Sequence, residues 1–100
     1  LICNTAKHKF KYNYHAFTII LKKNEREKFL KYLKKNNIIA FISFEALHLS
    51  KMGKKWLTKK TNLKNTDEII KKIVRLPMHN KLTIREVDYV CQKVKDYFHK

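Results

Sequence analysis

The sequence predicts a small α+β domain with two layers, an antiparallel sheet and the helices that cover one face of it. Short runs rich in β-branched and aromatic residues alternate with stretches whose apolar residues recur at helical spacing. The predicted order is strand, helix, strand, a long excursion with one short helix, strand, helix. A helical crossover makes the first two strands parallel, so the third strand can lie between them and antiparallel to both. The 100 residues suit one such domain.

The N-terminal residues differ in character from the rest of the chain. Residues 1–12 are polar and basic without a sustained period, so we expect a linker or arm from an upstream domain. The predicted domain then spans residues 13–100, and its first strand lies in the run 14–21. Because the first residue is Leu1 and not Met, we expect the chain to be a piece of a longer protein.

A helix and a second strand come after the first strand. Asn24 is placed to cap the helix, Phe29 and Leu33 lie on its apolar face, and Asn36-Asn37 can supply a left-handed residue at its end. Residues 38–44 are almost all apolar, which predicts a central strand covered on both faces.

The second half of the chain begins with an irregular excursion. It contains one short helix near residues 51–55 and a surface loop at 57–65. Thr66 is then expected to cap a helix that carries acidic residues in its first turn. The third strand is predicted at residues 74–78, where Pro77 ends it.

The last helix has the clearest sequence signal. Thr83 and Glu86 form the pattern of a capping box, in which each side chain accepts from the backbone N–H of the other residue. Behind this pair the apolar residues recur at helical spacing and form one stripe: Val87, Val90, Cys91, Val94, Tyr97 and Phe98.

The charge of the chain raises the possibility of a nucleic-acid partner. The formal net charge is +16, from 24 basic and 8 acidic side chains. The lysines are spread along the chain, and arginine, which reads phosphate and guanine with two parallel hydrogen bonds, occurs only at Arg26, Arg75 and Arg85. A lysine-rich solvated surface is therefore favoured, and a stand-alone basic nucleic-acid-binding module remains the alternative.

Other classes of protein are less consistent with the sequence. No run of about 18 uncharged apolar residues is present, so no membrane span is predicted. Cys3 and Cys91 lack the spacing of a zinc site, the histidines show no metal-ligand spacing, and two cysteines are too few for a disulfide framework. We therefore expect reduced thiols, a cytoplasmic location and no metal.

Four segments together resemble the carboxyl end of the DegT/DnrJ-type sugar-nucleotide aminotransferases. They are NYHAFTI at 13–19, the helix that begins with Glu25-Arg26, AFISFEALHLSKMG at 40–53 and LPMHNKLTIREVDYV at 76–90. The resemblance covers roughly residues 13–98. Within the family the spelling is most similar to the transaminases that make dTDP-4-amino-4,6-dideoxygalactose for lipopolysaccharide or common-antigen biosynthesis.

The resemblance implies a fold and an activity for a longer parent protein. The chain would be the C-terminal small domain of a type I fold pyridoxal-phosphate aminotransferase, which would move an amino group from glutamate to a dTDP-4-keto-6-deoxyhexose. The parent would be a homodimer. The family carries its Schiff-base lysine and its phosphate cradle in a large domain N-terminal to this region. The chain alone would therefore lack the catalytic lysine, bind no cofactor and be inert.

The resemblance also nominates a substrate-side loop. His48 matches the histidine that ends the family's Pro-Leu-His loop, whereas Ser43 stands where the family has another histidine and Ala46 where it has proline. An imidazole can donate a hydrogen bond to a sugar or phosphate, and a serine hydroxyl is shorter. The alternative for His48 is a structural role, packed against Trp56 or hydrogen-bonded to backbone. A structural role is favoured for His15.

Overall fold

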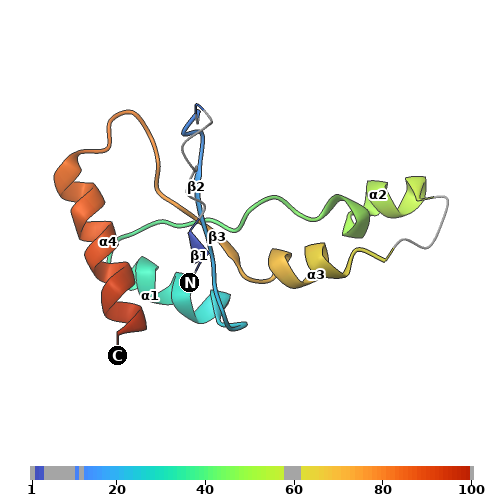
Figure 1. The fold of residues 1–100 in the computed structure, drawn as a ribbon, viewed down its shortest axis with the longest axis horizontal. Helices are drawn as coiled ribbons and strands as arrows, with labels where there is room; N and C mark the ends of the chain where they lie inside the picture. Colours follow the sequence, from blue (N-terminus) through green and yellow to red (C-terminus); the bar gives the residue numbers. More distant parts are fainter. Residues whose placement is uncertain (1, 4–10, 12, 58–61, 100) are drawn as a thin grey trace.

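The computed structural model describes residues 2–3, 11, 13–57 and 62–99 of the chain (Figure 1). It is a small α+β structure, as the sequence predicts. In chain order its elements are β1 (Ile2–Cys3), β2 (Phe17–Ile20), α1 (Arg26–Lys35), the 3-10 turn η1 (Leu47–Leu49), α2 (Lys51–Trp56), α3 (Lys64–Ile70), β3 (Ile73–Leu76) and α4 (Ile84–Phe98).

The sheet has three strands in the order β1-β2-β3, and both pairs are antiparallel. Ile19 lies opposite Val74 at the centre of the β2–β3 pair. On its other side β3 makes one antiparallel bridge, between Arg75 and Phe41. Strand β3 therefore lies between β2 and the segment around Phe41, which contributes one bridge and no strand. Strand β1 was not expected, because residues 1–12 were assigned to a linker or arm.

The prediction of a central strand at residues 38–44 is wrong. Only Phe41 pairs with β3, and no further strand of the described residues lies beyond it. Ile38 is buried, whereas Ile39, Phe41, Ile42 and Phe44 are all more than half exposed. The apolar run was taken as a sign of burial on both faces, but the segment lies at the edge of the sheet and then leaves it.

Helices α1 and α4 lie together on one side of the sheet (Figure 1). Phe29 of α1 is fully buried, and its ring centroid lies 4.9 Å from that of Tyr97 and 5.4 Å from that of Phe98, both on α4. The core cluster joins these helices to the sheet. Its buried members are Ile19, Leu21, Phe29, Leu33, Ile38, Val74 and Val94.

A long arm projects from the opposite side of the sheet (Figure 1). We define the arm as residues 42–57 and 62–72, which include η1, α2 and α3. It contributes no residue to the core cluster. Its large apolar side chains are exposed instead, with Leu47 at 82%, Phe44 at 78% and Trp56 at 73%. A surface of this kind marks a site of interaction with another part of a protein or a partner.

The helix boundaries confirm some sequence signals and correct others. The short helix near residues 51–55 is present as α2, and Asn37 adopts the left-handed conformation after α1, with a φ of 59°. Helix α1 has Glu25 and not Asn24 at its N-cap. Helix α3 begins at Lys64, so Thr66 lies inside it and does not cap it.

Helix α4 begins with the predicted capping box. The Glu86 N–H donates to the Thr83 hydroxyl over 3.2 Å, and the Thr83 N–H donates to the Glu86 carboxylate over 2.8 Å. The Thr83 backbone N–H, and then the Thr83 hydroxyl, hold the pKa of Glu86 below its usual value. Glu86 is therefore ionised at neutral pH and committed to the cap.

We expect Thr83→Ala to lower the free energy of unfolding by about 1 kcal/mol, because one N–H of the first helical turn loses its acceptor. The measurement is the urea midpoint, followed by circular dichroism. Thr18→Ala is the matched control for the loss of a threonine, since Thr18 lies in β2 and caps no helix. A midpoint that does not move in Thr83→Ala would contradict the role of the box.

Candidate functional site

The loop nominated by the sequence connects the sheet edge to the arm. It leaves the sheet after Phe41, whose N–H and C=O both bond to Arg75. The Arg75 guanidinium then lies over the ring of Phe44, with its central carbon 5.8 Å from the ring centroid. Ala46 is buried and precedes η1, which carries His48. The backbone of Ala46 has a φ of −62°, a value that the family's proline would also adopt.

A compact junction joins η1 to α2. The Ser50 hydroxyl accepts from the Gly53 N–H over 2.9 Å and donates to the Leu47 carbonyl over 2.8 Å. Ser50 is therefore the N-cap of α2 and at the same time holds η1 against its first turn. The position of His48 is set by this junction.

His48 is held by a carboxylate from the other half of the arm. Its Nε2 atom lies 2.6 Å from Oδ1 of Asp67, in the first turn of α3. The His48 side chain is only 11% exposed, and that of Asp67 is 45% exposed. The alternative of a bond to backbone is not seen for His48. It does line, together with Trp56, an open hollow of about 470 Å³.

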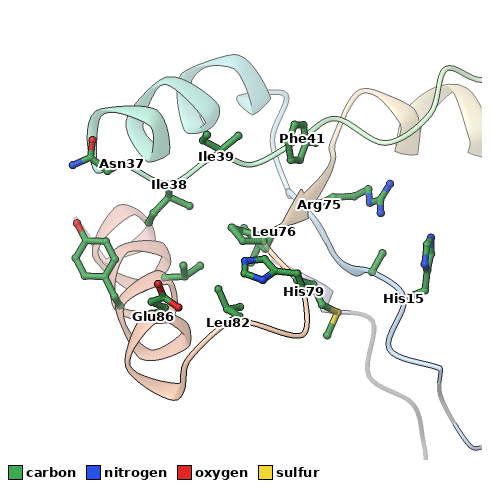
Figure 2. A pocket seen from close by; sticks show the side chains of 15 residues that line it. His15, Asn37, Ile38, Ile39, Phe41, Arg75, Leu76, His79, Leu82 and Glu86 are labelled. Atoms are coloured by element: carbon green, nitrogen blue, oxygen red, sulfur yellow. The ribbon is translucent and has the colours of Figure 1, made fainter.

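Another hollow lies between the edge of the sheet and α4 (Figure 2), and we call it the sheet-edge hollow. Its volume is about 620 Å³. Apolar walls come from Ile38, Leu76 and Val90, and polar side chains line it as well: His15, Asn37, Arg75, His79, Glu86 and Tyr89. Glu86 is occupied by the cap, and the Tyr89 hydroxyl donates to the Asn36 carbonyl.

The structure does not bring all the nominated residues together. Neither Ser43 nor His48 lines the sheet-edge hollow, whereas His15, for which a structural role was favoured, does. Residues 58–61 of the predicted surface loop lie outside the described residues. Sequence reasoning missed Asp67 as the partner of His48, since a separation of 19 residues has no pattern that would reveal it.

The described residues contain no group of three or more His, Cys, Asp or Glu side chains that could hold a metal ion. Among the same residues, none of the helices has the length and apolar character needed to cross a membrane.

Comparison with known proteins identifies the family. Residues 1–95 match the DegT/DnrJ/EryC1/StrS aminotransferase family. The chain belongs to this family. No curated protein matches it.

Two solved structures share the fold. Aminotransferase TlmJ from Streptoalloteichus hindustanus superposes with a TM-score of 0.83 over 98% of this chain, at 15% identity. PseC from Helicobacter pylori, an aminotransferase involved in the biosynthesis of pseudoaminic acid, superposes with a TM-score of 0.72 over 85% of this chain, at 18% identity. The chain spans 26% and 24% of the length of these two proteins, about a quarter in each case.

The sheet-edge hollow of this family member does not by itself fit pyridoxal phosphate, the cofactor of these aminotransferases. The cofactor needs a lysine that forms a Schiff base, an acid facing the pyridinium nitrogen and a phosphate cradle. The sheet-edge hollow offers Arg75 and two histidines to an anion, but no lysine lines it. Its one carboxylate, on Glu86, is committed to the helix cap.

Proposed function

We propose that the chain is the C-terminal small domain of a sugar-nucleotide aminotransferase, with residues 13–100 as the domain and residues 1–12 as its connection to an upstream large domain. The observation that carries the proposal is the family match over residues 1–95, in a chain that spans about a quarter of TlmJ and of PseC. The large domain would hold pyridoxal phosphate, because no lysine lines the sheet-edge hollow of this chain.

The reaction of the complete enzyme would be the transfer of an amino group from glutamate to a dTDP-4-keto-6-deoxyhexose, for surface polysaccharide biosynthesis. This assignment rests on the sequence resemblance of residues 40–53 and 76–90 to the aminotransferases of that subgroup. The dTDP-4-amino-4,6-dideoxygalactose transaminases remain the proposed subgroup. The complete enzyme would act in the cytoplasm as a homodimer. The loop that carries Ser43 and His48 would meet the sugar nucleotide.

The arm supports the proposal that a further part of the enzyme packs here. Leu47, Phe44 and Trp56 are exposed in the chain alone. Burying one such side chain contributes roughly 1.5–3 kcal/mol. The superposition on TlmJ covers 98% of the chain, so the extended arm is part of the shape shared with a much longer aminotransferase. The large domain is the partner we propose for the arm.

We expect the isolated chain to form no specific Schiff base with pyridoxal phosphate. The test is incubation with the cofactor, borohydride reduction and mapping of labelled lysines, on this chain and on the protein extended by the segment encoded upstream. The extended protein should carry the label on one lysine outside these 100 residues. The urea-unfolded chain gives the level of nonspecific labelling, which matters for a chain so rich in lysine. A single stoichiometric label within the 100 residues would refute the proposal.

No observation favours the alternative of a nucleic-acid-binding module. Such modules stack bases on exposed aromatic side chains of a sheet. Phe17, the aromatic residue of β2, packs against the core cluster. The positive charge alone gives no specific site.

A further inference from the structure

The contact between His48 and Asp67 joins the two halves of the arm. Leu47–Leu49 form η1, Lys64–Ile70 form α3, and the pair connects them across 19 positions of sequence. It is the one ion-pair contact found among the described residues. A carboxylate cannot donate when it is ionised, so the hydrogen in this contact belongs to Nε2 of His48. The other ring nitrogen, Nδ1, is not used in this contact.

We propose that Asp67 is a positioning residue for His48, which holds the ring through Nε2 and leaves Nδ1 as the only ring nitrogen that can meet a ligand. The proposal rests on the proposed function, in which this loop meets a sugar nucleotide. It adds the ring atom that makes the contact. With Nε2 held by Asp67, Nδ1 would meet a polar group of the ligand such as a sugar hydroxyl, which can both donate and accept a hydrogen bond.

The surroundings of His48 agree with this role. The open hollow that His48 helps to line has mainly apolar walls, with Leu47 and Trp56 among them. The His48 side chain itself is only 11% exposed, so few water molecules compete for its hydrogen bonds. The junction of Ser50 and Gly53 holds the backbone of η1, and Asp67 holds the ring. Backbone and side chain are therefore fixed from different elements, as a binding group requires.

The first test is the protonation of the His48 ring in the isolated chain, observed by nitrogen-15 NMR and assigned by its loss in His48→Gln. We expect a proton on Nε2, bonded to the carboxylate. In Asp67→Ala the Nε2 signal should change, because this atom loses its acceptor. Asp67→Asn should keep the Nε2 proton, because the amide oxygen can still accept it.

Glu68→Ala is the matched control, because Glu68 is the exposed acidic neighbour of Asp67 on the same helix. An Nε2 atom without a proton in the wild-type chain would overturn the proposal. So would a His48 ring that is the same in Asp67→Ala as in the wild type. Asp67→Asn keeps the test decisive if Asp67→Ala disturbs the arm.

The second test uses the extended enzyme. His48→Ala and Asp67→Ala should each lower kcat/KM for the sugar nucleotide about tenfold, which is the typical effect of one lost hydrogen bond to a polar group. The double variant should lose no more than either single variant. The half-reaction with the amino donor should keep its rate in all three. Equal losses in both half-reactions would mean a purely structural role. If the extended protein has no aminotransferase activity, the proposed function fails, while the NMR test still decides the role of Asp67.

Discussion

Phe29→Ala is expected to lower the free energy of unfolding by about 3–5 kcal/mol, the range for removing a fully buried aromatic ring. Phe29 is fully buried and packs against both Tyr97 and Phe98, so it joins α1 to α4. A domain of this size has roughly 5–15 kcal/mol of stability in total. The variant should therefore be largely unfolded or have a much lower urea midpoint, measured by far-ultraviolet circular dichroism.

Phe44→Ala is the matched control for this substitution. It removes the same side chain, but Phe44 is 78% exposed and its one described contact is with the Arg75 guanidinium. An exposed cation–π contact contributes about 0.5–1 kcal/mol. We expect a loss of no more than that. If the two variants had equal midpoints, the assignment of the core to the α1–α4 interface would be wrong.

The elements that the sequence predicted well depend on neighbouring residues. Thr83 and Glu86 are three positions apart, and both halves of their capping box are formed in the structure. Asn37 likewise adopts the left-handed conformation expected at the end of α1. The apolar faces that bury Phe29 and Val94 follow from helical spacing. In each case the signal comes from residues that lie within a few positions of one another or on one helix.

The elements that were missed depend on distant residues or on the rest of the protein. Residues 38–44 are apolar enough for a central strand, but the sheet ends at the bridge between Phe41 and Arg75. Strand β1 forms because Ile2 and Cys3 pair with β2, and their own sequence shows no strand period. Asp67 meets His48 only because the arm folds back on itself. The composition of a segment does not predict which residues, distant in the sequence, it will contact in the folded protein.

Tyr97 gives a further example of a long-range contact without a sequence signal. Its hydroxyl donates to the Glu25 carboxylate over 3.2 Å, from the last turn of α4 to the start of α1. Burial first, and then the nearby charge of Glu25, raise the pKa of Tyr97 above its usual value. The hydroxyl therefore remains a donor at neutral pH, and the two helices are held together at this end by a polar contact as well as by aromatic packing.

Gly53 is the position in the arm where a single methyl group should have the largest effect. A Cβ placed on Gly53 would lie 1.6 Å from the Leu47 carbonyl oxygen and 2.7 Å from its carbon, both in backbone. These distances are far below van der Waals contact. Helix propensity alone would make Gly53→Ala stabilising by about 1 kcal/mol, because alanine is the better helix former. The clash with the backbone of η1 reverses that sign.

We expect Gly53→Ala to push η1 away from α2 at a cost above the 1–3 kcal/mol or so of ordinary overpacking, because backbone and not a flexible side chain must move. The hydrogen bond from Ser50 to Leu47 would break, and His48 would move away from Asp67. The sheet and the α1–α4 core should remain folded, since the arm contributes nothing to the core cluster.

The measurement is amide hydrogen exchange, which should accelerate in α2 and leave α4 unchanged. Lys55→Ala, in the same helix, is the control and should not accelerate exchange. If Gly53→Ala behaved like Lys55→Ala, η1 and α2 would not be in the close contact described, and the position of His48 would have to be explained by Asp67 alone.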